Sequence, residues 1–215
     1  MLILASLAGS VLAADPPKDP SLIPVEDVAG LPRVLLIGDS ISMGYTAPTR
    51  ELLAGKANVH RVLDNCGPTS RGVERIDAWV GEGKWDVIHF NFGLHDLKRM
   101  EDGKQQVPLE QYEANLRTIV GKLKATGAKL IWASTTPVPD AKVSPPRSNA
   151  DVIAYNEVAA KIMAGNGIAI DDLYSFAFPR LANIQTPANV HFKPVGYRAL
   201  AEQVAWATRK ALAEQ

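Results

Sequence analysis

Short runs of aliphatic residues alternate with helical segments along this chain. Residues 34–37 are four consecutive aliphatic side chains, the pattern of a strand that is buried on both faces of a parallel sheet. Similar runs predict four more strands, at residues 58–63, 85–92, 129–134 and 168–170. Apolar spacing and helix-boundary residues predict five helices, at residues 48–53, at 70–80, from Pro108 to Gly127, at 148–163, and from Pro194 onward.

Five alternations of strand and helix predict an α/β fold. Its expected form is a three-layer α/β/α sandwich around a five-stranded parallel sheet. Residues 15–32 carry five prolines and predict an extended lead-in, so the domain itself is expected to span residues 33–215. Four prolines in residues 135–147 predict a loop over the strand ends. A length of 215 residues is sufficient for one well-buried domain.

The N-terminal residues suggest export. Residues 1–14 are apolar and end in small side chains, which resembles the hydrophobic region and cleavage site of a secretory signal without its basic start. We therefore expect a signal-peptide remnant and a secreted or periplasmic bacterial protein, and a buried N-terminal helix is the alternative. Cys66 is the only cysteine, so no intrachain disulfide can form.

Charge and ligand spacing narrow the classes of partner. Lys and Arg together count 23, as do Asp and Glu, so no overall field attracts nucleic acid or an anionic membrane. We expect neither as a partner, and we expect no cofactor. A metal hydrolase built on Asp39, Asp96 and His191 is a minor alternative, because no pair of residues has zinc-type spacing.

Polar residues follow the predicted strands at the end where ligands bind to parallel sheets. Ser40 follows the first strand and is a candidate nucleophile, although an Asp-Ser helix cap is the plainer interpretation of that pair alone. Further polar segments follow the second and third strands and precede the last helix, at residues 65–67, 91–96 and 188–192. We expect these segments to meet at one crevice.

Taken together, these segments resemble the four sequence blocks of the SGNH (GDSL-type) hydrolase family. The matching segments are Gly38-Asp39-Ser40, Asn65-Cys66-Gly67-Pro68-Thr69, Gly93-Leu94-His95-Asp96 and Val190-His191-Phe192-Lys193-Pro194. The resemblance covers roughly residues 33–212 and implies a flavodoxin-like fold. It also implies that Ser40 is the nucleophile, that His191 is its base, and that Gly67 belongs to the oxyanion hole.

Two departures from the family pattern bear on the site. His95 stands where the family usually has Asn, so the oxyanion hole is expected to combine the Ser40 and Gly67 N–H groups with a side-chain donor from His95 or, alternatively, Asn91. Ala188 stands where the acid usually lies. Asn189 is then the nearest polar group to orient His191, with Asp171, Asp172 or a backbone carbonyl as alternatives.

The expected function is a serine esterase that acts through an acyl-enzyme on a small-molecule or polysaccharide ester, with carbohydrate O-acetyl groups preferred on the family resemblance. A lipid ester or thioester hydrolase is one alternative, and a non-catalytic carbohydrate-binding protein on the same fold is another. Other candidate residues are interpreted as structural: His60, His89 and Cys66, as well as the aromatic residues Tyr45, Trp132 and Tyr155, whose alternative role is to stack on sugar rings.

Overall fold

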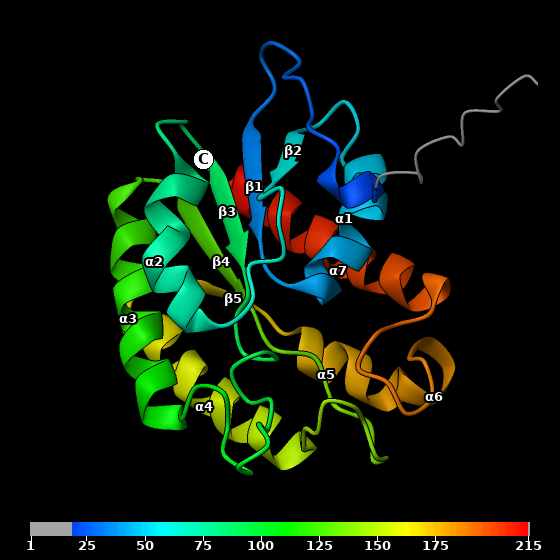
Figure 1. Ribbon diagram of the computed structural model, residues 1–215. Coiled ribbons are helices and arrows are strands. Elements are labelled where there is room, and N and C mark those ends of the chain that lie inside the picture. Colours follow the sequence, from blue (N-terminus) through cyan, green and yellow to red (C-terminus); the bar gives the residue numbers. More distant parts are fainter. Residues whose placement is uncertain (1–18, 215) are drawn as a thin grey trace, which may run out of the picture.

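A parallel sheet lies between two layers of helices in the computed structural model, which describes residues 19–214 (Figure 1). Its strands are β1 (Arg33–Ile37), β2 (Asn58–Arg61), β3 (Val87–Phe90), β4 (Lys129–Ala133) and β5 (Ala169–Asp171). All neighbouring strands are parallel, in the order β2-β1-β3-β4-β5. This order is the flavodoxin-like one, so the predicted fold is confirmed.

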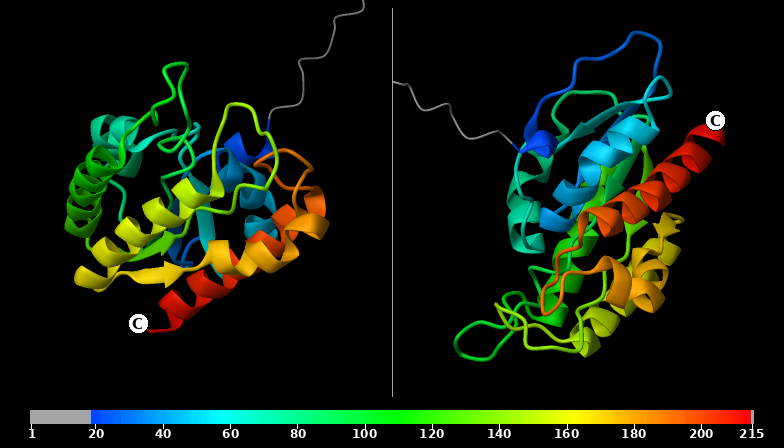
Figure 2. Two further views of the ribbon diagram at one scale, coloured as in Figure 1. Left: turned by 90° about the horizontal axis from the view of Figure 1, so that it is seen from below. Right: turned by 90° about the vertical axis from the view of Figure 1, so that its right-hand side faces the viewer.

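Both faces of the sheet are covered by helices. The main helices are α1 (Ser40–Leu52), α2 (Thr69–Val80), α3 (Leu109–Ala125), α4 (Asn149–Gly165) and α7 (Pro194–Ala213). Helices α1 and α7 pack together on one face, while α3 contacts both α2 and α4 on the other (Figures 1 and 2). The aliphatic run of β1 is at most 2% exposed, because side chains on both faces of this strand meet a helical layer.

The first helix begins earlier than the sequence predicts. The predicted helix at residues 48–53 starts at a proline, but Pro48 lies inside α1. Asp39 is the true N-cap, and its carboxylate accepts the N–H of Ile41 at 2.9 Å. Packing of α1 on α7 and the sheet outweighs the backbone hydrogen bond that Pro48 cannot donate.

Predicted boundaries elsewhere are accurate to a few residues. The predicted cap of α4 is present, since Ser148 Oγ accepts the N–H of Asp151 at 3.1 Å. Several short elements were not predicted, because three to five residues are too few to show a period: η1 (Pro20–Leu22), α5 (Leu173–Ala177), η2 (Phe178–Arg180) and α6 (Leu181–Ile184). The last three lie between β5 and α7.

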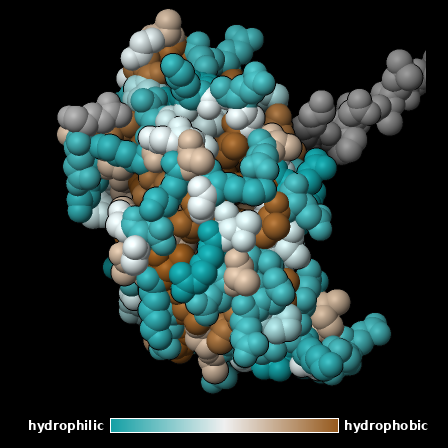
Figure 3. Space-filling model, turned by 90° about the vertical axis from the view of Figure 1, so that its left-hand side faces the viewer, coloured by the Kyte–Doolittle hydropathy of each residue, from teal (hydrophilic) through white to brown (hydrophobic). Residues whose placement is uncertain are grey.

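The remaining predictions concern the start of the chain and its surface. The predicted signal-peptide remnant, residues 1–14, lies outside the described residues. Residues 19–32 contain η1 and a turn in which the Leu31 N–H donates to the Val28 carbonyl at 3.3 Å, so the predicted lead-in is not extended throughout. The N–H of Val28 donates to Asn58 Oδ1 on β2 at 2.9 Å. Within residues 19–214, no helix has the length and apolar character needed to cross a membrane. The side of the molecule that carries α2 and α3 is mostly hydrophilic, with smaller hydrophobic areas between (Figure 3).

Candidate active site

Ser40 and His191 meet at the carboxyl end of the sheet, although 151 positions separate them in the chain. Ser40 is the first residue of α1, directly after the turn that follows β1. Its Oγ lies 2.9 Å from Nε2 of His191, which precedes α7. The two elements that carry these residues pack against each other, so the fold itself holds the pair together.

Glycine at position 38 permits the turn that presents Ser40. A Cβ on Gly38 would lie 2.7 Å from the Cβ of Ser42, which is closer than real side chains approach. The Gly38 carbonyl accepts a hydrogen bond from the buried guanidinium of Arg61 at 3.0 Å, and the same guanidinium donates to the Ser42 hydroxyl. Arg61 was not singled out from the sequence, because nothing in the spacing of β2 shows that its side chain points toward this turn.

A short hairpin-like segment holds His191. Gln185 and Phe192 form an isolated antiparallel bridge, and the N–H of Thr186 donates to the carbonyl of His191 at 2.9 Å. Ala188, at the tip, has a φ of 51°, a left-handed conformation that non-glycine residues rarely adopt outside functional turns.

Asn189 contacts the imidazole from within this segment. Its Oδ1 accepts both the backbone N–H of His191 at 2.9 Å and the ring Nδ1–H at 2.8 Å. Because the backbone group can only donate, it determines that the amide oxygen faces the ring. With Nδ1 protonated, Nε2 is left to accept the hydroxyl hydrogen of Ser40.

The alternative partners of His191 are engaged elsewhere. Asp171 pairs with His89 at 3.0 Å, and both side chains are fully buried. Asp172 caps α5, where its Oδ1 accepts the N–H of Ser175 at 3.1 Å. Neither carboxylate contacts His191, so the geometry favours Asn189.

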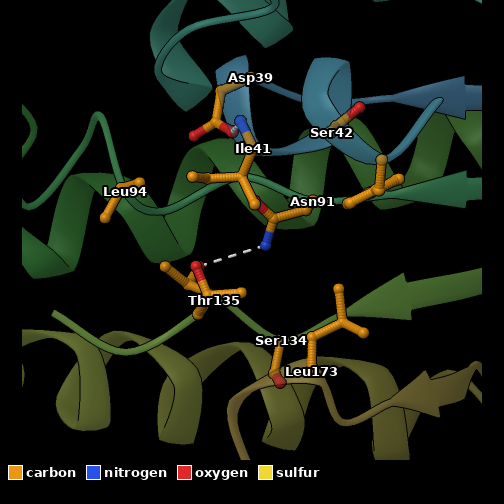
Figure 4. Close-up of a pocket in the computed structure, with 10 residues that line it drawn as sticks. Asp39, Ile41, Ser42, Asn91, Leu94, Ser134, Thr135 and Leu173 are labelled. Atoms are coloured by element: carbon orange, nitrogen blue, oxygen red, sulfur yellow. Dashed lines mark hydrogen bonds between the residues drawn. The ribbon is translucent and has the colours of Figure 1, made fainter. Parts of the chain in front are cut away.

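Two of the four predicted oxyanion donors already have acceptors. The N–H of Gly67 donates to Asn65 Oδ1 at 3.0 Å, within a tight turn in which Gly67 has a φ of 63°. The Asn91 amide donates both of its hydrogens, to the carbonyl of Ala133 at 2.8 Å and to Thr135 Oγ1 at 3.2 Å (Figure 4). Asn91 therefore holds β3 to β4 and has no hydrogen left to donate.

The other two predicted donors have no hydrogen-bond acceptor among the described residues. Across residues 19–214, no group accepts the N–H of Ser40, which is the first amide of α1 and points out of the helix. Burial lowers the pKa of His95, as do the nearby charges of Arg147 and Lys98, while Asp39 opposes them. The imidazole of His95 is therefore neutral near pH 7 and can donate one N–H.

A small cavity adjoins the turn that carries Ser40. It has a volume of about 10 Å³, close to the space of one water molecule. Its walls come from the nucleophile turn and from the ends of β3 and β4, with Ile41, Leu94 and Thr135 among the lining residues (Figure 4).

The other candidate side chains that the sequence offers for catalysis or sugar stacking are buried in the protein. Cys66 is fully buried, and burial raises the pKa of its thiol to about 12, so it is not a competent nucleophile. The three aromatic residues considered for sugar stacking, Tyr45, Trp132 and Tyr155, are each 1% exposed and belong to the core. In the described part of the chain, no three His, Cys, Asp or Glu side chains gather as metal ligands would.

Comparisons with known proteins agree on one family. The GDSL-like lipase/acylhydrolase family matches residues 36–199, while no curated protein matches the chain. The structure of an acetyl xylan esterase, AlAXEase, is similar with a TM-score of 0.70 and 17% identity over 82% of this chain and 98% of that one.

Two further solved structures are similar. A lipase/acylhydrolase from Enterococcus faecalis has a TM-score of 0.70 and 21% identity, covering 82% of this chain and 95% of that one. An acetylxylan esterase from Geobacillus stearothermophilus has a TM-score of 0.67 and 20% identity, covering 80% and 92%. Because the family match spans most of the chain, from β1 into α7, this protein belongs to the GDSL-like lipase/acylhydrolase family and is an SGNH-type ester hydrolase.

Proposed function

We propose that this protein is a serine esterase that removes short acyl groups, preferably O-acetyl groups on carbohydrate. The observation that carries the proposal is the continuous hydrogen-bonded chain from Ser40 Oγ through the His191 ring to Asn189 Oδ1, with contacts of 2.9 and 2.8 Å. Such a chain is the arrangement in which a base activates a serine hydroxyl while a third group orients the base.

The reaction then proceeds in two halves. Ser40 Oγ attacks the ester carbonyl carbon as its proton passes to His191 Nε2, and the oxyanion intermediate collapses with cleavage of the bond to the alcohol oxygen. His191 returns the proton to that departing oxygen, which leaves an acyl group on Ser40. Water then attacks the acyl-enzyme with His191 again as base, and the acid and the free Ser40 hydroxyl are released.

Oxyanion stabilisation is assigned to the Ser40 N–H and the neutral His95 ring. The Ser40 amide has no acceptor among the described residues and lies at the positive end of α1. Gly67 can add a third hydrogen bond only if its N–H is shared between Asn65 Oδ1 and the substrate.

Two observations support a short acyl group on a carbohydrate. The cavity next to the nucleophile turn holds about one water molecule, and Ile41, Leu94 and Leu173 among its lining leave no room for a long acyl chain there. Two of the structures similar to this chain are described as acetyl xylan esterases. Export, which the N-terminal residues predict, would bring such an enzyme to polysaccharide outside the cytoplasm.

Replacement of the nucleophile tests the reaction. Ser40→Ala is expected to lower kcat for p-nitrophenyl acetate by roughly three orders of magnitude or more. Cys66→Ala is the matched control, because this thiol is buried near the site, and it should retain activity. An Ser40→Ala variant that turns over the ester at the wild-type rate would refute the assignment.

Substrate preference is tested separately on the wild-type protein. Hydrolysis of p-nitrophenyl acetate, butyrate and octanoate should fall steeply with chain length, and acetate should be released from acetylated xylan. A preference for octanoate would instead favour a lipid ester, in line with the lipase/acylhydrolase among the similar structures.

A further inference from the structure

A second, larger cavity lies under the loop that follows β4. It has a volume of about 730 Å³ and is formed between the proline-rich loop of residues 138–149 and the turns of η2 and α6. The different views place this yellow-green loop next to the orange segment that carries η2 and α6 (Figures 1 and 2). The volume is within the range of ligand-binding pockets.

Both walls of the cavity continue into the catalytic segments. Arg147 lines the cavity, and its Nε donates to the carbonyl of Leu94 at 2.8 Å, immediately before His95. On the other side, Gln185 follows α6 outside the lining, and its Nε2 donates to the carbonyls of Pro137 and Val190 at 2.9 and 3.3 Å, which joins the loop to the segment of His191. Arg147 of the cavity also lies near enough to His95 for its charge to lower the pKa of that imidazole, so the cavity and the candidate active site are linked through Arg147.

An exposed aromatic ring forms part of the lining. Phe178 is 52% exposed, unlike the buried aromatic residues of the core. Its ring stacks on Tyr174 with centroids 5.6 Å apart and planes at 16°, and the Tyr174 hydroxyl accepts a hydrogen bond from Asn149 at 2.8 Å. Phe178 is thus a supported ring that leaves apolar surface open to the cavity.

The polar groups of the lining are available to a ligand. Asp140 and Lys142 line the cavity, and neither side chain pairs with another group in the described part of the chain. Together with the Arg147 guanidinium they supply both acceptors and donors of hydrogen bonds. An alkyl chain would make no hydrogen bond to these charged groups. A pyranose ring has an apolar C–H face for Phe178 and hydroxyl groups for the charged side chains.

We propose that this cavity is the subsite for the alcohol part of the substrate and that it binds a pyranose ring of an acetylated oligosaccharide. The inference rests on the proposed function, since it takes Ser40 as the point of cleavage. It adds that Phe178 is a specificity-determining residue for the sugar.

Removal of the aromatic ring tests the subsite in the full-length protein. For Phe178→Ala, the ratio of kcat/KM on acetylated xylooligosaccharides to kcat/KM on p-nitrophenyl acetate should fall by about two- to tenfold, mainly through KM. Trp206→Ala is the matched control, because Trp206 is a 53% exposed aromatic on α7 outside the cavity, and its ratio should equal that of the wild type. An unchanged ratio in Phe178→Ala would overturn the proposal.

A binding measurement separates the subsite from the reaction. Titration of Ser40→Ala with unacetylated xylotetraose, followed by NMR or calorimetry, should show binding that is weakened by the additional Phe178→Ala change. If the wild type cleaves no acetylated oligosaccharide while xylotetraose still binds through Phe178, the proposed substrate fails and the subsite stands. If xylotetraose does not bind at all, the subsite is refuted.

Discussion

At the residue scale, the catalytic imidazole is oriented by an amide oxygen and not by a carboxylate. The oxygen of Asn189 can hold the His191 ring in the correct tautomer, but it carries no charge to stabilise the imidazolium that forms in the transition state. Asn189 is also exposed, so water competes with its hydrogen bond. Its contribution to catalysis should therefore be modest, and a negatively charged acceptor at this position should stabilise the imidazolium better.

Two substitutions at Asn189 separate orientation from charge. Asn189→Ala removes the hydrogen bond and should lower kcat by roughly fivefold. This corresponds to an increase of about 1 kcal/mol in the activation free energy. Asn189→Asp keeps an acceptor and adds a negative charge that favours the imidazolium. The base is then protonated up to a higher pH, so the acidic limb of the kcat/KM profile should move upward.

An equal change of charge elsewhere controls for long-range effects. Asn183→Asp places the same charge on α6, where Asn183 is exposed. Its pH profile should follow the wild type. If Asn189→Asp and Asn183→Asp shift the profile equally, direct contact with the ring is not the cause.

At the scale of helices and strands, the packing of α1 on α7 connects the two catalytic residues. Gly44 lies at this contact, where an added Cβ would be 2.1 Å from the Tyr197 ring. Tyr197 also meets Phe192 edge to face at 5.9 Å, so its ring cannot move away from α1 without disturbing the segment next to His191. The glycine thus permits the close approach that joins the base to its nucleophile.

Gly44→Ala is expected to impair both stability and catalysis. Overpacking at the contact should reduce the free energy of unfolding by about 1–3 kcal/mol, and displacement of Phe192 should lower kcat. Gly121→Ala in α3 is the matched control, because nothing lies within 4 Å of its added Cβ and alanine favours a helix. Urea unfolding and ester hydrolysis of both variants check this, and equal effects in the two would exclude the steric explanation.

Elements and site differ in how far the sequence predicts them. Buried strands are local patterns, so the sheet and its helical layers were predictable, while the Ser40–His191 pair followed from the resemblance of the polar blocks to a known family. The start of α1 was not, because Pro48 is tolerated only through tertiary packing. The hydrogen bond from the Gly67 N–H to Asn65 depends on loop geometry that the sequence does not show. The exposure of Phe178 depends on helices too short to show a hydrophobic periodicity.

A buried carboxyl group couples the stability of the whole molecule to pH. Asp96 is fully buried where α2 begins, and its Oδ1 accepts hydrogen bonds from the Thr69 N–H and hydroxyl. Asn115 of α3 donates to the same hydroxyl at 3.1 Å, so this carboxyl group links the active-site loop to two helices. Burial raises the pKa of Asp96 from an ordinary 3.8 to about 7, despite the hydrogen bonds from Thr69.

The sign of the pH dependence follows from this shift. Below about pH 4 the carboxyl group is protonated in both the folded and the unfolded chain, and its stabilising contribution is complete. Between about pH 4 and 7 the unfolded chain releases a proton that the folded chain retains, so the free energy of unfolding falls as pH rises. The rise of this pKa from 3.8 to about 7 corresponds to a loss on the order of 4 kcal/mol over the window. The lowered pKa of His95 opposes this loss up to about pH 6.5, while the lowered pKa of Asp172 acts only below the window.

Asp96→Asn should remove this dependence, because the amide is neutral at every pH while its oxygen can still accept from Thr69. Urea unfolding at pH 4.5, 6 and 7.5 should show a decline in the wild type that the variant lacks. The variant should instead gain stability as pH rises toward 6.5, because the pKa of His95 is lowered in the folded chain. Asp102→Asn changes an exposed carboxylate and should keep the wild-type decline. If Asp96→Asn declines as steeply as the wild type between pH 4.5 and 7.5, another group must release the proton and the raised pKa of Asp96 is refuted.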